Sequence, residues 1–415
     1  MSRKRKNSEE LTHTGPFARL HRQMKPYKTV LFLGDGMADE PIAELGGRTP
    51  LQAANTPNMD TIARLGRSGT MLTLPAGFPT SSDVANMSVL GCDLATEMCG
   101  RGPLEAASQG IKLGPDDIAF RMNLVTVDAG GVLRDFSGGH IAQADAVEAI
   151  RLLNEQLGSD KIRFYPGVSY RNLLVLSGPE FSAAISYDKP DDNHGQPVAK
   201  HLPRTKSAEG QFTAALLRDL IARADEVLKG REANGIWPWS GGKAGAIHNI
   251  CQLYGIKAAV ISAVDVINGL GACMGMDVIK VPGATGYIDT NYEGKADAAV
   301  KALADGYDFV YIHVEAIDEV SHAQDLQLKL QAIEDFDERI VGRVMIAAGP
   351  EVAYCVLPDH PVPLALGKHT RTPVPVAVYQ PGVEPDGVQT FDEQAAPKGG
   401  LGRLWGSGLM DLLLK

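Results

Sequence analysis

The stretch KTVLFLGDG, residues 28–36, decides the fold and marks the expected start of ordered structure. Residues 28–33 form a short apolar run, partly β-branched, which is typical of a buried strand. The run ends at Gly34-Asp35-Gly36, which is a turn signal. Asp35 is therefore expected directly after the carboxyl end of a buried strand.

Runs of the same kind recur late in the chain, at residues 258–262, 278–281, 309–313, 352–357 and 374–378. Helix-like segments at residues 292–304 and 326–346 lie between several of these runs. Strands that alternate with helices predict an α/β fold, in which a mostly parallel sheet is covered by helices on both faces.

The middle of the chain has a different pattern, in which strand-like pieces, two longer helix-like segments and a polar loop follow one another. We expect this part to form a second α+β domain that is inserted into the first. The expected units are a disordered basic tail, a first domain in two parts and the inserted domain, at residues 1–26, 27–111 with 236–415, and 112–235.

The composition is that of a globular protein with an acidic balance. Apolar residues make up 44% and charged residues 22% of the 415 residues, which excludes an intrinsically disordered chain. Forty basic and fifty acidic residues leave a formal net charge of −10. This balance argues against broad nucleic-acid binding, so no nucleic-acid partner is expected.

The cysteine pattern and the apolar runs indicate a cytoplasmic location. Five cysteines occur, an odd number without a C-x-x-C pair, which is typical of a reducing compartment. No apolar run approaches the roughly 20 residues that span a bilayer, so no membrane partner is expected. The basic residues 3–6 are not followed by an apolar stretch, which argues against a secretory signal.

Metal-ligand side chains lie close to the ends of the expected buried strands. Sites in open α/β sheets form beyond the carboxyl ends of the strands, so distant segments are expected to converge there. The spacing of four between Asp318 and His322 puts both on one face of a helix. The complete set is Asp35, Asp318, His322, Asp359, His360 and His369.

Each of these residues alone is more often a helix cap, a turn residue or a hydrogen-bonded histidine than a ligand. Together they form an oxygen and nitrogen set without cysteine, which suits Mn²⁺, Zn²⁺ or a related divalent ion. Six ligands exceed the need of one tetrahedral ion, and two ions in one site are a standard arrangement for displacement at phosphorus. The joint pattern therefore favours a metal centre.

A serine pair, Ser81-Ser82, stands where a turn gives way to an apolar helix start. In a structural role, such a serine caps the helix. In a chemical role, a hydroxyl next to a metal ion is activated as a nucleophile without a histidine base. The residues alone favour the cap.

Nine stretches, taken in order, resemble the archaeal-type cofactor-independent phosphoglycerate mutases of the alkaline phosphatase superfamily. The resemblance covers nearly the whole chain after residue 27. The stretches are GDGMADEPIAELGGRTPLQAANTPNMD (34–60), SSDVANMSVLGCD (81–93), GRGPLEAASQGI (100–111), GGHI (138–141), YPGVSYRNLLV (165–175), VPGATGYIDTNYEGKA (281–296), HVEAIDEVSH (313–322), PDHPVP (358–363) and KHTRTPVPV (368–376).

The resemblance implies an alkaline-phosphatase-like three-layer αβα core and an inserted domain that clamps the substrate. It implies that Ser82 is the phosphorylated nucleophile. It also implies two metal centres, one formed by Asp35, Ser82, Asp359 and His360 and the other by Asp318, His322 and His369. Weaker matches to phosphate and carboxylate ligands are Arg101, His140, Arg171 and Lys243, with Arg163 as a further candidate.

The implied reaction interconverts 3-phosphoglycerate and 2-phosphoglycerate in two steps. Ser82 takes the phosphoryl group, the glycerate reorients, and its other hydroxyl takes the group back. The implied cofactors are two divalent metal ions, with Mn²⁺ favoured and Zn²⁺, Co²⁺ or Mg²⁺ as alternatives. The implied partner is a small phosphorylated anion, and the sequence does not indicate the oligomeric state.

One segment departs from the family pattern. Residues 187–204 read YDKPDDNHGQPVAKHLPR, which does not match the archaeal mutases. Some bacterial relatives with the same metal core are proposed homoserine kinases. A homoserine kinase-like phosphotransferase or a phosphatase on the same core therefore stays as the alternative function.

Overall fold

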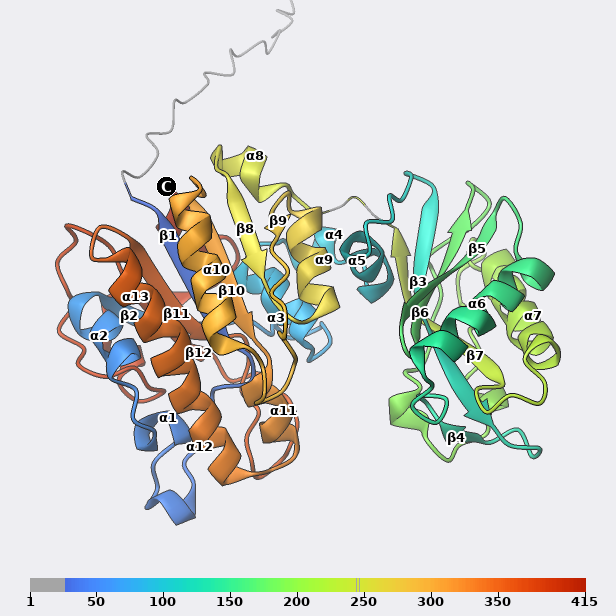
Figure 1. Ribbon diagram of the computed structural model, residues 1–415, viewed down its shortest axis with the longest axis horizontal. Coiled ribbons are helices and arrows are strands. Elements are labelled where there is room, and N and C mark those ends of the chain that lie inside the picture. The colour runs from blue at the N-terminus through green and yellow to red at the C-terminus, as the bar shows by residue number, and fades with distance from the viewer. Residues whose placement is uncertain (1–26, 244, 246) are drawn as a thin grey trace, which may run out of the picture.

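The computed structural model describes residues 27–243, 245 and 247–415, and the tail expected at residues 1–26 lies outside them. Two units, each built around a sheet, lie side by side (Figure 1). The larger sheet has eight strands, in the order β13-β2-β12-β11-β1-β10-β8-β9. In that order, their bounds are Gly402–Leu404, Arg67–Met71, Val374–Tyr379, Ala353–Pro358, Thr29–Gly34, Phe309–Val314, Ala258–Ile261 and Asp277–Val278.

Strand β1 shows why the sheet is buried on both faces. Leu31 and Leu33 belong to one apolar cluster, whereas Val30 and Phe32 belong to the other, because successive side chains of a strand point to opposite faces. Helices on the first face are α3 (Ser82–Val89), α8 (Ile250–Tyr254), α9 (Asp265–Cys273) and α14 (Gly408–Leu414). Helices on the second face are α2 (Pro57–Leu65), α10 (Tyr292–Ala304), α12 (Leu326–Asp335) and α13 (Arg343–Ala348).

The predicted α/β class is confirmed, with a three-layer αβα arrangement. Neighbouring strands of the large sheet are parallel except at β12, which is antiparallel to both β11 and β2. The expected helix at 326–346 is interrupted by a π-helical stretch, η4 (Phe336–Gly342), between α12 and α13. The strand expected at 278–281 is observed as the shorter β9, at residues 277–278, which pairs only with Ala259 and Val260 of β8.

The smaller sheet has the strand order β4-β3-β6-β5, and β7 pairs with the part of β3 that precedes its pairing with β4. Helices α6 (Gln143–Leu157) and α7 (Gln211–Val227) pack on one face and share one apolar cluster with the strands. The strand bounds, from β3 to β7, are Asp117–Val127, Leu133–Asp135, Ile162–Val168, Arg171–Ser177 and Gly235–Lys243.

The smaller unit extends beyond residue 235, where its end was expected, because strand β7 belongs to its sheet. The strand begins there and is hydrogen-bonded to β3 from Gly235 to Lys243. Its residues therefore belong to the smaller sheet and not to the second half of the larger unit. The polar letters that end the strand, Ser-Gly-Gly-Lys, concealed this pairing in the sequence.

Helix α5 (Arg101–Ser108) lies between the two units, against α9 on one side and against β3 and β7 on the other (Figure 1). Two glycines permit this close packing. A Cβ at Gly102 would lie 2.1 Å from the Ala119 carbonyl oxygen, and a Cβ at Gly269 would lie 1.7 Å from that of Leu104. The helix is therefore the packed junction between the units.

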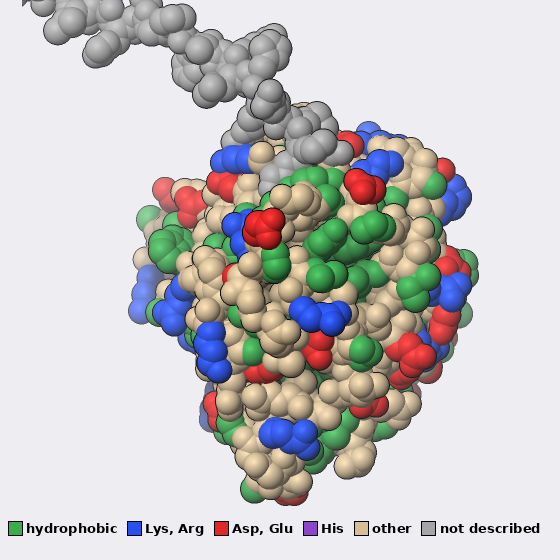
Figure 2. Space-filling model, turned by 90° about the vertical axis from the view of Figure 1, so that its left-hand side faces the viewer, with side chains coloured by type: hydrophobic (Ala, Val, Ile, Leu, Met, Phe, Trp, Pro, Cys, Tyr) green, Lys and Arg blue, Asp and Glu red, His purple; other side chains and the backbone are tan. Residues whose placement is uncertain are grey.

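The opposite side of the larger unit carries apolar side chains at its surface (Figure 2). A shallow groove of about 300 Å³ lies between α2 and the end of α13, and Leu65 and Ile346 are among its exposed lining residues. In the described part of the chain, no helix has the length and apolar character needed to cross a membrane.

A buried polar network holds the loop that follows β1. Asp39 accepts a hydrogen bond of 2.7 Å from the Lys329 ammonium on α12. The Asp39 backbone N–H donates to Glu393 at 3.0 Å, and the Thr49 hydroxyl donates to the same carboxylate at 2.6 Å. The network joins the loop of Asp35 to α12 and to the C-terminal segment.

Burial raises the pKa of Glu393 from 4.5 to about 7, against the opposing effect of Lys329. Between these two values the folded state binds more protons than the unfolded state, so stability falls as the pH rises through this window. We expect Glu393→Gln to raise the free energy of unfolding by about 1–2 kcal/mol at pH 8.5 and by little at pH 4.5. Denaturant unfolding at both pH values measures this, and an equal effect at both would contradict it.

Candidate metal centre

The site lies where three neighbouring parallel strands end. Asp35 follows β1, Asp359 and His360 follow β11, and His313 is near the end of β10. The two outer strands pair with β1 in register, Leu33 opposite His313 and Gly34 opposite Pro358. The strand ends therefore bring these side chains to one edge of the sheet, as the sequence predicted for Asp35, Asp359 and His360.

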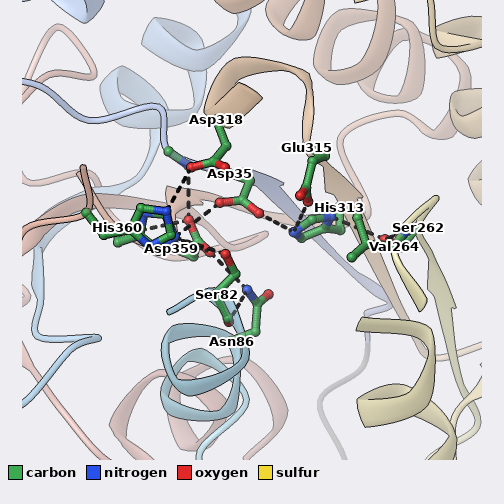
Figure 3. Close-up of polar contacts among 12 residues, drawn as sticks. Asp35, Ser82, Asn86, Ser262, Val264, His313, Glu315, Asp318, Asp359 and His360 are labelled. Atoms are coloured by element: carbon green, nitrogen blue, oxygen red, sulfur yellow. Dashed lines mark hydrogen bonds and ion pairs between the residues drawn. The ribbon is translucent and has the colours of Figure 1, made fainter. Parts of the chain in front are cut away.

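Asp35 is fully buried at the centre of the group (Figure 3). Its Oδ2 lies 3.1 Å from His313 Nε2, and its Oδ1 lies 3.3 Å from His360 Nε2. Asp359 accepts hydrogen bonds from the backbone N–H of Gly36 at 3.1 Å and of His360 at 2.8 Å. The backbone thus fixes Asp359 beside Asp35.

Asp318 and His322 lie on α11 (Ala316–His322), where the spacing of four brings them together as predicted. His322 Nε2 is 3.2 Å from Asp318 Oδ2, and His369 Nε2 is 3.5 Å from Asp318 Oδ1. The His369 ring stacks on the His360 ring with 3.8 Å between centroids. These residues are therefore continuous with the group around Asp35.

Ser82 opens α3 and points into the group. Its Oγ lies 3.2 Å from His360 Nε2. Ser81 occupies the N-cap position, yet its side chain makes no capping hydrogen bond. The residues alone favoured a serine side chain that caps the helix, and this prediction is wrong, because Ser81 occupies the cap position without capping through its side chain.

The environment of the cluster disfavours charge on two of its carboxylates, Asp35 and Glu315, in the absence of a cation. At Asp318, by contrast, burial is opposed by the neighbouring imidazoles of His322 and His369, which lower the pKa. Burial raises the pKa of Asp35 well above its usual value, and Asp359, Asp318 and Glu315 raise it further. Burial, followed by the charge of Asp318, raises the pKa of Glu315 to about 8. Several buried ligand atoms have no hydrogen-bond partner, namely Asp35 Oδ1, Glu315 Oε2, Asp318 Oδ1, His360 Nδ1 and His369 Nδ1.

This combination fits a divalent cation. Buried carboxylates that repel one another, with oxygen atoms left unpartnered, are stabilised when a positive charge lies between them. Ligand atoms within 4.8 Å of one another form the groups Asp35-Asp359-His360, Asp318-His360-His369 and Asp35-His313-Glu315. His360 belongs to two of these groups, so it links the two sets that the resemblance implied.

Three further residues of the site were missed from the sequence: His313, Glu315 and Asn86. Burial, followed by Lys295, lowers the pKa of His313 to about 3, so its imidazole is neutral. We assign its Nε2–H as the donor to Asp35, since Ser262 Oγ lies 3.2 Å from its Nδ1. A histidine that ends an otherwise apolar buried run was the available signal.

Asn86 connects the serine helix to the sheet. Its Nδ2 donates to the Ser82 carbonyl at 2.8 Å and to Asp359 Oδ2 at 3.0 Å, and the Tyr311 hydroxyl donates to its Oδ1. The spacing of four from Ser82 puts both on one face of α3, which was the signal in the sequence.

Basic side chains from the junction of the units face a tryptophan. The guanidinium groups of Arg101 and Arg121 lie 5.9 and 5.0 Å from the ring centroid of Trp239. Both contact Glu105, at 3.4 and 2.7 Å. Arg101 was predicted, whereas the buried Arg121 was missed because it lies within the apolar strand β3.

Arg171 begins β6 and lies within electrostatic reach of α11. Burial and Asp318 raise the pKa of Glu319, the residue after Asp318, while His322 and Arg171 oppose this shift. Burial lowers the pKa of Arg121, and the charges of Arg101 and Arg171 lower it further, whereas Glu105 raises it. Arg171 therefore interacts electrostatically both with Arg121 and with Glu319 of α11.

The other predicted substrate ligands lie elsewhere. Lys243 pairs with Ile118 of β3, whereas Arg171 pairs with Asn123, which separates them by about 17 Å along the strand. The Lys243 ammonium lies 3.6 Å from Asp116. His140 is an exposed turn residue with a φ of 54°, and Arg163 is exposed on β5.

Comparisons with known proteins agree with this geometry. The chain matches the family model described as the Metalloenzyme superfamily over residues 27–415. It is 46% identical to a protein of Methanosarcina acetivorans named 2,3-bisphosphoglycerate-independent phosphoglycerate mutase, covering 94% of this chain and 100% of the relative. A probable mutase of the same name from Geobacter sulfurreducens is 45% identical and covers 93% and 99%.

Two solved structures share the fold. The PH0037 protein from Pyrococcus horikoshii has a TM-score of 0.78 at 29% identity, covering 93% of this chain and 96% of that one. The cofactor-independent phosphoglycerate mutase from Thermoplasma acidophilum has a TM-score of 0.66 at 30% identity, covering 93% and 98%. The chain therefore belongs to the Metalloenzyme superfamily and, within it, to the 2,3-bisphosphoglycerate-independent phosphoglycerate mutases. Membership implies divalent metal ions.

Proposed function

We propose that this protein interconverts 3-phosphoglycerate and 2-phosphoglycerate through a phosphoserine at Ser82. The observation that carries the proposal is the position of the Ser82 hydroxyl, 3.2 Å from His360 in a buried group of carboxylates and imidazoles. The names of relatives at about 45% identity over nearly the whole chain support the same reaction. They do not favour the homoserine kinase-like alternative.

The proposed ligands are those of the two implied sets, Asp35, Ser82, Asp359 and His360, and Asp318, His322 and His369. We propose two ions, with Mn²⁺ favoured. When bound, they would lower the pKa of a serine hydroxyl and offset charge on a transferring phosphoryl group. The backbone N–H groups of Gly36 and His360 and the Asn86 amide hold Asp359 in position for this role.

The substrate is a small anion that carries a phosphate and a carboxylate. We propose that Arg101 and Arg171 bind these groups, because guanidinium groups recognise both in a bidentate manner. Arg121 positions Arg101, since both contact Glu105 and the face of Trp239. For Lys243 and His140, a role in substrate binding is supported by the family resemblance alone, since Lys243 contacts Asp116 and His140 lies in an exposed turn.

We also propose that the smaller unit, residues 112–243, moves as a substrate-clamping domain against the larger unit. Its Arg171, at the start of β6, interacts electrostatically with Glu319, the residue after Asp318. Closure of this kind would keep water from a phosphoserine while the glycerate reorients.

The direct test is an assay of metal-loaded protein with 3-phosphoglycerate and no 2,3-bisphosphoglycerate. We expect 2-phosphoglycerate to form until the two isomers reach equilibrium. ATP with homoserine is the parallel assay for the alternative. Metal-loaded, folded protein that forms no 2-phosphoglycerate would refute the proposal, and phosphohomoserine formation would replace it.

Activity is expected to fall at acid pH, because protons compete with metal for His322, His360 and His369. At limiting metal we expect more than about a tenfold loss between pH 7.5 and 5.5, with much of it restored by excess metal. Initial rates over a grid of pH and Mn²⁺ concentration measure this. A loss that excess metal leaves unchanged would count against imidazole ligation.

A further inference from the structure

A second group of metal-ligand side chains lies apart from the candidate metal centre, at the junction between the units. Cys92, Glu97 and His248 place a sulfur, a carboxylate oxygen and a ring nitrogen within 4.8 Å of one another. Cys92 is buried, and the other two side chains are 15% and 21% exposed. The candidate metal centre, by contrast, includes no cysteine among its described residues.

The three residues come from separate parts of the chain. Cys92 lies two residues before the short helix α4 (Leu94–Glu97), and Glu97 is the last residue of that helix, which follows α3 in the chain. The N-cap Asp93 holds this helix because its carboxylate accepts a hydrogen bond from the Ala95 N–H. His248 lies on the connection that leaves β7, and its Nδ1 is 2.9 Å from a Glu97 oxygen.

Two more thiols lie near this group. Burial raises the pKa of Cys92, with Glu97 as the next cause, and Cys99 and Cys273 add to the shift. Cys273 ends α9, next to Met274, whose carbonyl accepts the N–H of Ile250 two residues after His248. Neither thiol lies within 4.8 Å of all three ligand atoms, so either would have to turn toward the group to supply a fourth ligand.

We propose that Cys92, Glu97 and His248 bind one Zn²⁺ ion, with Cys99 or Cys273 as the fourth ligand. Thiolate, imidazole and carboxylate are the ligands that Zn²⁺ takes in proteins, in a tetrahedral arrangement. Bond lengths of about 2.0–2.3 Å place tetrahedral ligand atoms roughly 3.5 Å apart, which the spacing within this group permits. Binding releases the Cys92 proton, so it strengthens as the pH rises.

The ion would hold the segment that leads from the end of β7 to His248, and so from the smaller unit to the larger one. Before the connection, Gly242 packs so closely that a Cβ would lie 1.7 Å from the Cys99 carbonyl oxygen. After it, His248 contacts Glu97. Both ends of the connection are thus held against residues 97–99, and a Zn²⁺ ion would replace the hydrogen bond between His248 and Glu97 with one coordinate bond from each side chain to the metal.

Cobalt binding to the full-length protein tests the proposal. A cysteine ligand gives Co²⁺ a thiolate-to-metal charge-transfer absorption, whereas oxygen and nitrogen ligands do not. We expect this absorption in the wild-type protein, with the intensity of one thiolate-bound Co²⁺ per chain beside any Co²⁺ at the candidate metal centre, and we expect added Zn²⁺ to remove it. We expect Cys92→Ser to abolish it and Cys251→Ser to retain it, because Cys251 bonds to the Gly275 carbonyl outside the group.

His248→Gln is the second variant, since its partly exposed side chain limits the risk of misfolding. We expect it to weaken Co²⁺ binding in the thiolate band by at least tenfold, with an unchanged circular dichroism spectrum. Cys99→Ser and Cys273→Ser then identify the fourth ligand, since only one of them should alter the band. Absence of the band in the wild-type protein, or its persistence in Cys92→Ser, would overturn the proposal, whatever the protein does with phosphoglycerate.

Discussion

Ser82→Ala is expected to reduce turnover of 3-phosphoglycerate by roughly 10⁴-fold or more, because it removes the attacking oxygen itself. The helix should persist, since the Ser82 carbonyl keeps its hydrogen bond from Asn86 and the side chain supplies no cap. The measurement is kcat for the metal-loaded variant, with the unfolding temperature as the check on folding. Mass spectrometry of acid-quenched wild-type protein should find phosphate on the peptide that contains Ser82.

Ser81→Ala is the matched control. It lies one residue earlier, and its side chain makes no capping hydrogen bond. We expect it to change kcat by less than about threefold, because the transfer needs only one positioned hydroxyl. Full turnover in Ser82→Ala, or an equal loss in both variants, would show that Ser82 is not the nucleophile.

Asp35→Asn is expected to have opposite effects on the metal-free protein and on activity. Without metal, Asp35 is buried next to Asp359, Asp318 and Glu315, so a neutral side chain of the same shape relieves repulsion. We expect the unfolding temperature of the chelated variant to rise by about 2–4 °C relative to the wild-type protein. With Mn²⁺, we expect the metal-induced rise in unfolding temperature to disappear, together with turnover, because a ligand is lost.

Asp337→Asn separates this effect from the general loss of a buried carboxylate. Asp337 is also fully buried, but it accepts the backbone N–H groups of Asn58 and Met59 at the start of α2, at 3.2 and 2.7 Å. We expect this control to lower the unfolding temperature in both forms and to keep the metal-induced rise. A destabilised, metal-free Asp35→Asn protein would mean that repulsion among the carboxylates is not significant.

The fold was largely predictable because its signal is local. A run such as residues 30–33 is apolar at every position only when both faces of a strand are covered, and such runs alternate with helices in this chain. Helix α10 was predicted with its observed bounds, Tyr292–Ala304. The limit of the smaller unit was not predictable from composition, because β7 ends in polar residues and is defined by its pairing with β3.

The candidate site was predictable in part. The spacing of four predicts that Asp318 and His322 lie close together on a helix. The rule that sites form at the carboxyl ends of parallel strands predicts the position of Asp35 and Asp359. The choice between Ser81 and Ser82 rested on resemblance, since adjacent residues of a helix start point in different directions. Arg121 was missed because it lies within the apolar strand β3, where a polar residue has no periodic signal. His313 and Asn86 had weak signals, namely the end of an apolar run and the spacing of four from Ser82.

The sequence by itself therefore determined the α/β class and the residue types available for a metal centre. Only the tertiary structure decided which of them meet. Ser82 and His360 are 278 positions apart, and the contact of 3.2 Å between them depends on how α3 packs at the end of β11. The same holds for Cys92, Glu97 and His248, which have no common sequence pattern and are brought together by the junction of two sheets. Local periodicity encodes burial, whereas convergence at a site depends on packing between segments that are distant in the chain.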